Sequence, residues 1–193
     1  ERPGYNSPQI IKLAGRNILV NFSAYHLMGH DTKTGELLWT HTQDNTPPDK
    51  RSPGMGDTHS NTVIFDSGYI FYAAGDGNCG VKLALAGDGN SITEVWRNKD
   101  FDSYMGGIVK INDFLYGCGT AKPDFKSLNV ETGELGEVLK IGSGVVISAD
   151  SMLYYYNQRG EVMLLTSDPL NMEVKGKFKI TIRKSSSLKF RYG

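Results

Sequence analysis

The sequence predicts an all-β protein built from four copies of a four-stranded antiparallel unit. Short runs of β-branched and aromatic residues alternate with turns that contain Gly, Asp or Asn, a pattern typical of β-hairpins. The same hairpin returns along the 193 residues at a loose interval. Its central residues, which lie 51, 45 and 38 positions apart, are Leu19, Ile70, Leu115 and Leu153. This interval is close to the roughly 40 to 50 residues of a β-propeller blade.

Each unit is expected to contain four consecutive strands. The first strands are residues 8–13, 61–66, 106–111 and 144–149. The second strands are residues 16–22, 67–73, 112–118 and 150–156. The third strands are residues 24–31, 80–86, 125–131 and 160–166. The fourth strands are residues 36–41, 92–98, 134–140 and 172–180. The predicted fold is a β-propeller with about four four-stranded antiparallel blades.

We expect residues 1–180 to form one propeller region, with blades at about 4–42, 58–99, 104–141 and 143–180. Residues 43–57 form a Pro-rich loop between blades, which either covers one channel mouth or contacts a partner, or is an inert insertion. Residues 181–193 form a basic tail, because from Lys175 onward the chain has seven Lys or Arg residues and no acid. A solvated tail and a contact for an acidic partner are both compatible with this composition.

Composition excludes several classes of protein. Hydrophobic residues make up 39% and charged residues 22%, a globular profile, and the formal charge of zero lacks the basic footprint of a nucleic-acid-binding domain. No apolar run is long enough to span a membrane, and the first residues lack the features of a signal peptide. Cys79 and Cys118 are interpreted as two inert small hydrophobic residues, with a single disulfide in an oxidising compartment as the alternative.

The stretch "DTKTGELLWT" predicts a contact that holds two adjacent blades together. Asp31 and Thr34 can hydrogen-bond to the backbone of the turn, and Gly35 supplies the positive φ that a tight turn requires. Trp39 follows on the outer strand, where its ring can pack against the next blade while the indole N–H bonds to a carbonyl at the seam. Trp96 and the Thr132-Gly133 turn repeat parts of this pattern.

The pattern Asp-x-x-Thr-Gly-x-x-x-Trp resembles the tryptophan-docking repeats of pyrroloquinoline-quinone (PQQ) type β-propellers. From about Gly4 to Ile180 the chain is similar to bacterial PQQ-binding-like, quinoprotein alcohol dehydrogenase-like repeat proteins, some of which are labelled polyvinyl-alcohol dehydrogenases. The resemblance implies a periplasmic or exported protein, with PQQ and calcium as possible cofactors. It also implies seven or eight blades, so that missing blades or a second copy of this chain would complete the ring.

Two departures from the family pattern are visible. Glu137 stands where the docking aromatic is expected in the third unit. The fourth unit has neither the Thr-Gly turn nor a Trp, so we expect Val174, Phe178 and their neighbours to fasten it.

Candidate ligand contacts come from polar residues in loops near the first strands and from one Gly-rich turn. They are Tyr5, Asn6, His59, Asn61, Asp76, Asn78 and Tyr104. His59 and Asn61 either reach a ligand at the channel mouth or satisfy loop backbone groups. Residues 75–80 match G-x-G-x-x-G, but a strand is expected after them where a dinucleotide site needs a helix, so turn chemistry is the preferred interpretation. Calcium loops are disfavoured because no closing Glu follows.

The sequence therefore favours a non-catalytic propeller scaffold that binds a ligand or a protein at its channel face. A PQQ-dependent alcohol or polyvinyl-alcohol dehydrogenase is the alternative. No adjacent cysteine pair, no Trp outside the docking pattern and no nucleophilic triad can be identified, so no catalytic or metal-ligating residue is assigned.

Overall fold

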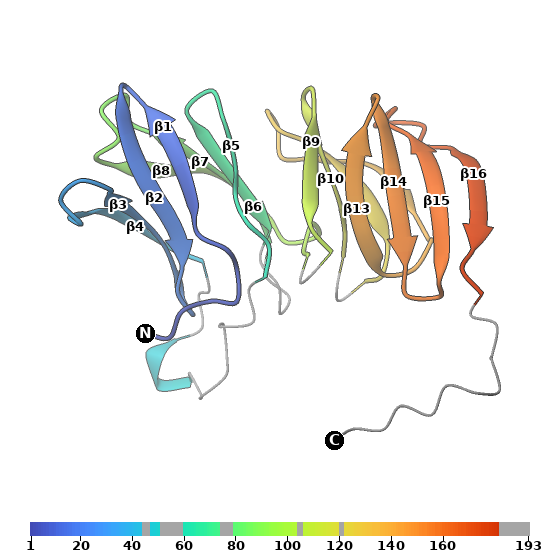
Figure 1. The fold of residues 1–193 in the computed structure, drawn as a ribbon, viewed down its shortest axis with the longest axis horizontal. Coiled ribbons are helices and arrows are strands. Elements are labelled where there is room, and N and C mark those ends of the chain that lie inside the picture. Colours follow the sequence, from blue (N-terminus) through green and yellow to red (C-terminus); the bar gives the residue numbers. More distant parts are fainter. Residues whose placement is uncertain (44–46, 51–59, 74–78, 104–105, 120–121, 182–193) are drawn as a thin grey trace, which may run out of the picture.

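The computed structural model describes residues 1–43, 47–50, 60–73, 79–103, 106–119 and 122–181. Within these ranges sixteen strands form four separate four-stranded sheets, each antiparallel and each built from strands that follow one another in the chain. The sheets are the blades of a β-propeller, as the sequence predicts. They are arranged side by side as an arc, with β1, β5, β9 and β13 toward the middle and β4 and β16 at the two outer ends (Figure 1).

The blades have the following strands. The first contains β1 (Gln9–Leu13), β2 (Arg16–Phe22), β3 (His26–Asp31) and β4 (Leu37–Thr42). The second contains β5 (Ile64–Asp66), β6 (Tyr69–Ala73), β7 (Gly80–Leu85) and β8 (Ile92–Asn98). The third contains β9 (Ile108–Ile111), β10 (Phe114–Cys118), β11 (Phe125–Asn129) and β12 (Leu135–Leu139). The fourth contains β13 (Gly144–Ala149), β14 (Met152–Asn157), β15 (Glu161–Thr166) and β16 (Val174–Lys179). Along the chain, a short 3₁₀ helix, η1 (Pro48–Lys50), follows β4 of the first blade and precedes β5 of the second.

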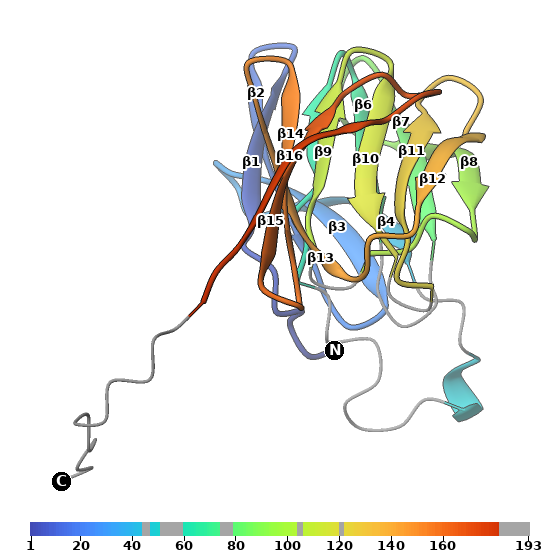
Figure 2. The ribbon, with the colours of Figure 1, turned by 90° about the vertical axis from the view of Figure 1, so that its right-hand side faces the viewer.

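Two-residue turns close the hairpins between first and second strands. Ala14 and Gly15 have φ values of 51° and 76°, and Ser67 and Gly68 have φ values of 51° and 84°. Positive φ at both central residues is the geometry whose twist matches that of the flanking strands. The edge-on view in Figure 2 shows these tight turns together at one end of the blades.

The hydrophobic core lies between the blades rather than within any one of them. Three clusters of buried side chains fill the seams between the first and second, second and third, and third and fourth blades. The second strands illustrate this arrangement. Their side chains alternate, so that one residue packs in the seam with the preceding blade and the next residue packs in the seam with the following blade. Ile70, Leu115 and Leu153 are fully buried against the preceding blade.

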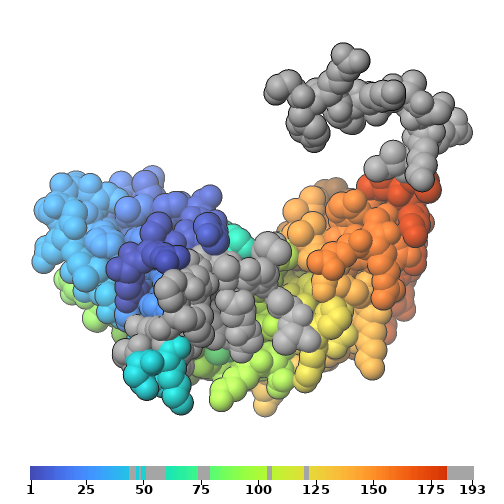
Figure 3. All heavy atoms as spheres, turned by 90° about the horizontal axis from the view of Figure 1, so that it is seen from below, coloured from blue at the N-terminus to red at the C-terminus, as the bar shows by residue number. Residues whose placement is uncertain are grey.

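The two ends of the arc lack this cover. Leu19, the equivalent of Leu115 in the first blade, is only partly buried. Tyr154, the equivalent of the buried Tyr116, is 38% exposed on the last blade. Viewed along the blades, the first and last blades stand on either side of an open hollow (Figure 3). Among the described residues, the four blades therefore form an open arc whose two end faces have no blade packed against them.

A register irregularity marks the outer strand pair of every blade. It falls at Gly29/His30, Lys82/Leu83, Lys126/Leu128 and Leu164/Leu165. Immediately beside it, Trp39 is paired with Gly29, Trp96 with Lys82, and Gly176 with Leu164. Because the blades share this register, each position on one outer strand can be matched to a position on the others.

Candidate binding site at the channel end

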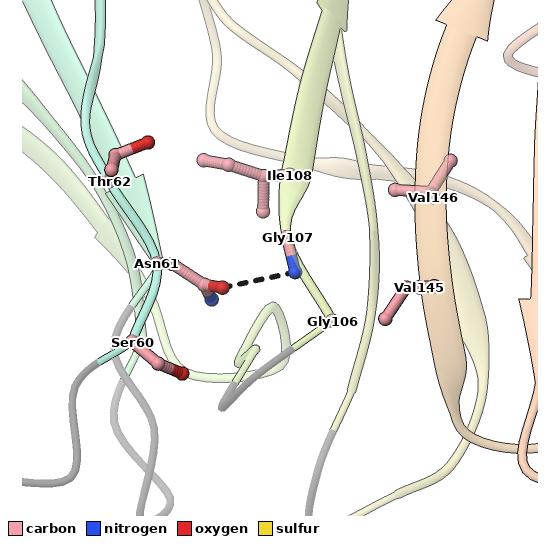
Figure 4. Close-up of a pocket in the computed structure, with 8 residues that line it drawn as sticks. All are labelled: Ser60, Asn61, Thr62, Gly106, Gly107, Ile108, Val145 and Val146. Carbon is pink, nitrogen blue, oxygen red and sulfur yellow. Dashed lines mark hydrogen bonds between the residues drawn. The ribbon is translucent and has the colours of Figure 1, made fainter. Parts of the chain in front are cut away.

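A cavity of about 310 Å³ lies where the first strands of the second, third and fourth blades begin. Its lining residues are Ser60, Asn61, Thr62, Gly106, Gly107, Ile108, Val145 and Val146. Figure 4 shows them on three neighbouring segments, the one that leads into β5 and the beginnings of β9 and β13. Hydroxyl, amide and backbone groups alternate there with aliphatic side chains, which suits binding of a peptide-like or small polar ligand.

Asn61 organises this site by joining two blades. Its Nδ2 donates to the carbonyl of Ser103 at 2.7 Å, and its Oδ1 accepts from the backbone N–H of Gly107 at 3.0 Å (Figure 4). The side chain is buried, so these bonds satisfy groups that would otherwise lose solvent contact. Asn61 thus supports the cavity through backbone groups, which is the structural role weighed in the sequence analysis.

Gly106 and Gly144 allow the third and fourth blades to approach closely beside the cavity. A Cβ added to Gly106 would lie 2.4 Å from the Gly144 carbonyl oxygen. The backbone N–H of Val146 also donates to the Gly106 carbonyl at 3.1 Å. Larger residues at Gly106 would separate the blades and open the site.

The remaining predicted ligand contacts do not assemble around the cavity. Tyr5 is 73% exposed, Asn6 donates to the neighbouring carbonyl of Ser7, and neither lines the cavity. His59, Asp76, Asn78 and Tyr104 lie outside the described residues, as does most of the Pro-rich loop and the tail from residue 182. After the Gly-rich turn, Gly80 begins a strand rather than a helix.

The residues do not fit a quinone cofactor at this cavity. A calcium-bound quinone needs carboxylate ligands and an aromatic stacking partner. No carboxylate is among the lining residues that the structure describes, and Trp39 and Trp96 are both held at blade seams. Within the described ranges no group of three or more His, Cys, Asp or Glu residues could hold a metal ion. Cys79 and Cys118 are buried free thiols in different seams.

Trp96 packs across the seam between the second and third blades. The ring of Trp96 lies on Gly133, since an added Cβ there would come within 2.8 Å of Trp96 Cδ2. The indole Nε1 donates to the Val130 carbonyl at 2.9 Å. The turn that receives the ring is held by Asn129, whose Oδ1 accepts from the backbone N–H of Thr132.

Trp39 differs from the expected geometry. Its ring is buried, 6% exposed, and lies on Gly29 of its own blade, where an added Cβ would be 2.2 Å from Trp39 Cε2. However, its Nε1 has no hydrogen-bond partner among the described residues, so the expected seam hydrogen bond is wrong. The turn after the third strand of the second blade has a different sequence, Ala86-Gly87-Asp88-Gly89-Asn90, without the Thr-Gly pair.

The fourth blade is also fastened differently from the prediction. Val174 and Phe178 are exposed, so they do not hold the seam. Instead, the Pro169 carbonyl accepts from Glu137 N–H at 2.9 Å and from Ser127 Oγ at 2.6 Å. Loop carbonyls of the fourth blade thus replace the missing Thr-Gly turn.

Tyr116 adds a further bond to the same seam. Its hydroxyl donates to the Ser167 carbonyl at 2.5 Å, and burial raises the pKa of this tyrosine to about 12. The seam therefore uses a neutral phenol as its donor. The sequence pattern alone did not reveal Tyr116, because an aromatic residue at this position reads simply as core.

A polar cluster at the seam of the first two blades was missed as well. His41 Nε2 lies 2.7 Å from Glu94 Oε2, and its Nδ1 lies 3.3 Å from the Tyr72 hydroxyl. Arg97 donates to Glu94 and approaches the Cys79 sulfur at 3.3 Å. Burial is the main cause that lowers the pKa of His41 and raises that of Tyr72, so both are held neutral. No local spacing signals this cluster, because His41, Tyr72 and the Glu94–Arg97 pair come from three different strands.

Comparisons with known proteins agree with this architecture. A family model described as "Outer membrane protein assembly factor BamB" matches residues 4–136. No curated protein matches the sequence. Among solved structures, BamB from Moraxella catarrhalis is similar with a TM-score of 0.68 and 15% identity, over 93% of this chain and 53% of that chain. The N-terminal domain of Nup159 is similar with a TM-score of 0.57 and 12% identity, over 93% of this chain and 46% of that chain.

The chain thus spans about half the length of the solved propellers that it resembles. In the part of the chain described by the structure, no helix has the length and apolarity needed to cross a membrane. The family model covers more than half of the sequence and includes the first two blades and most of the third. The chain therefore belongs to the family of the outer membrane protein assembly factor BamB and is built from PQQ-like propeller repeats.

Proposed function

We propose that this protein is a non-catalytic scaffold that binds a protein partner at the channel end of its blades. The cavity lined by Ser60–Thr62, Gly106–Ile108 and Val145–Val146 is the observation that carries the proposal. It presents backbone and hydroxyl groups beside aliphatic side chains, and such a surface can pair with an extended polypeptide. The family name supports a role in protein assembly at the outer membrane, and hence an exported, periplasmic location.

Site-specific photo-crosslinking tests this proposal. A photo-reactive amino acid incorporated at Thr62, which lines the cavity, should give an adduct with a defined protein in bacterial cells that express the chain. The same amino acid at Thr40, exposed on the outer strand β4, is the matched control and should not give that adduct. Absence of a protein adduct from Thr62, or an identical adduct from both positions, would contradict the proposal.

The enzymatic alternative can be examined separately. Purified protein is mixed with PQQ and Ca²⁺, and the quinone absorbance and alcohol-dependent reduction of a dye are followed. The scaffold proposal predicts neither a saturable absorbance change nor dye reduction. Alcohol-dependent turnover would instead support a PQQ-dependent dehydrogenase of the polyvinyl-alcohol type.

A further inference from the structure

We propose that mild acid loosens the seam between the first and second blades, and that His41 is the group whose protonation loosens it. Side chains of β4 meet those of β6 and β8 at this seam. In the described part of the chain, histidine occurs only in the first blade, and His41 is the one that faces the second. The proposal is independent of what binds at the channel cavity.

His41 occupies a position that holds a neutral amide at the next seam. It follows Trp39 by two residues on β4, as Asn98 follows Trp96 by two residues on β8. The shared register makes the two positions equivalent. Asn98 donates to the Gly133 carbonyl of the third blade at 2.7 Å. The equivalent contact with the second blade is therefore made by a ring that titrates near neutral pH.

The hydrogen bonds of His41 require a neutral ring with its proton on Nε2. Nε2 lies 2.7 Å from Oε2 of Glu94, and an ionised carboxylate only accepts, so Nε2 is the donor. Nδ1 lies 3.3 Å from the hydroxyl of Tyr72, which donates to it. Burial raises the pKa of Tyr72 and keeps its phenol protonated. His41 thus meets an acceptor and a donor of the second blade.

A second proton on His41 conflicts with this arrangement. Nδ1 would become a donor aimed at the Tyr72 hydroxyl, and the phenol would have to turn its own hydrogen elsewhere. The proton would also place a positive charge on a side chain that is only 10% exposed. Protonation therefore removes the bond to Tyr72 in its present form and leaves a cation with little solvent.

Glu94 does not compensate that charge, because its carboxylate is already paired with Arg97. Nη2 of Arg97 donates to Glu94 Oε2 at 2.7 Å, and Nε donates to Oε1 at 3.1 Å. The same Nη2 crosses the seam and donates to the Thr42 carbonyl at 3.2 Å. The charges of Glu94 and Arg97 cancel while His41 is neutral. Protonation would leave one uncompensated positive charge in the seam.

These surroundings keep the pKa of His41 below its usual value of 6.5. Burial is the largest cause, the Glu94 charge acts in the opposite direction, and the charge of Arg97 reinforces burial. Because the folded pKa lies below the unfolded value, the contribution of neutral His41 is complete above about pH 6.5. It is lost as the pH falls from there through the folded pKa.

The groups around His41 come from several elements. In the described chain, the titratable or charged groups that face this cluster or act on it are Tyr72 from β6, Cys79 directly before β7, Glu94 and Arg97 from β8, and His26 from β3, which pairs with Glu1.

The other two seams contain no described group that changes charge in mild acid. Two pairs of lysine and carboxylate, Lys82–Glu131 at 3.2 Å and Lys110–Asp66 at 2.7 Å, join the second and third blades. Lysines and carboxylates ordinarily titrate outside the range of about pH 5.5 to 7.5. Neutral hydroxyl and backbone donors join the third and fourth blades. Mild acid thus acts on one seam.

Hydrogen exchange of the full chain at about pH 7.5 and about pH 5.5 tests the proposal, with protection factors compared so that intrinsic exchange rates cancel. In the wild type, amides of β2 and β3 in the first blade should lose protection at the lower pH. Amides of β10 and β11 in the third blade should keep theirs. His41→Gln retains a donor and an acceptor but does not titrate, so it should abolish the loss.

His30→Gln is the matched control. His30 pairs with Leu19 on the open face of the first blade, away from the seam. This variant should lose protection in mild acid as the wild type does. Unchanged protection of the first blade in the wild type, a loss that persists in His41→Gln, a loss that His30→Gln also removes, or an equal loss in the third blade would each overturn the proposal.

Nitrogen NMR of the histidine rings in the wild type gives a second measurement, which stands even if His41→Gln fails to fold. At about pH 7.5 the His41 ring should carry its proton on Nε2, and it should titrate below the usual 6.5. A proton on Nδ1 at that pH, or titration at or above 6.5, would contradict the proposal.

Discussion

The indole N–H of Trp96 donates to the backbone carbonyl of Val130 at 2.9 Å, across the seam between the second and third blades. The indole of Trp39, in the same register position one blade earlier, has no such partner within the described chain. The two tryptophans of this protein are therefore equivalent in position and different in hydrogen bonding. This difference gives two predictions.

Trp96→Phe keeps an aromatic ring against Gly133 but removes the hydrogen bond to Val130. The variant should lose about 1 kcal/mol from the hydrogen bond, in addition to the effect of the smaller ring. Urea unfolding monitored by circular dichroism measures this loss. A variant as stable as the wild type would show that the seam bond contributes nothing.

Trp39→Ala should cost about 3 to 5 kcal/mol, because it removes a large buried ring from a packed site. Trp39→Phe should cost less than Trp96→Phe, since no hydrogen bond is lost. Melting temperatures of the three tryptophan variants provide the comparison. An unaltered melting temperature for Trp39→Ala would mean that the ring does not fasten the blade.

Asn61→Ala should destabilise the protein by about 1 to 3 kcal/mol, because it leaves the Gly107 N–H and the Ser103 carbonyl without their partner. Thr62→Ala, at the neighbouring position in the cavity lining, serves as the control and should have a much smaller effect. Equal stabilities of the two variants would argue against Asn61 as the link between blades.

Acid should weaken the Asp31 turn. A hydrogen bond from Arg16 at 2.7 Å, together with the Lys33 and Thr34 N–H groups, lowers the pKa of Asp31 to about 2. Because the folded pKa is below the unfolded value of about 3.9, the contribution is present above pH 4 and is lost as the pH falls toward 2. Asp31→Asn, which copies Asn129, should therefore be less stable than the wild type at pH 6, and the gap should close by pH 2. A gap independent of pH would contradict this assignment.

The strand order and most strand positions could be predicted from the sequence. β2, β8 and β13 match the expected residues at both ends, because alternating β-branched runs and two-residue turns determine a hairpin locally. The burial of Trp39 and the positive φ of Gly35 also followed from local pattern.

The errors concern contacts between blades. Whether the Trp39 N–H meets a carbonyl depends on the turn of the next blade, and the bond from Tyr116 to Ser167 joins residues 51 positions apart. The cavity likewise assembles from three segments that are distant in sequence, of which only Asn61 was a candidate. Local pattern predicted that Trp96 packs at a seam, but it did not determine which groups of the neighbouring blade each seam residue meets.

The central claim is that the four blades form an open arc whose end faces lack partners, and static light scattering on the purified chain tests it most directly. Leu19 on the first blade and Tyr154 on the last occupy positions that are buried in the seams between blades, and here they are not. We expect a weight-average mass above the 21.3 kDa of one chain, rising with concentration in the micromolar range, because exposed apolar faces associate. A monodisperse and stable monomer over that range would contradict the account.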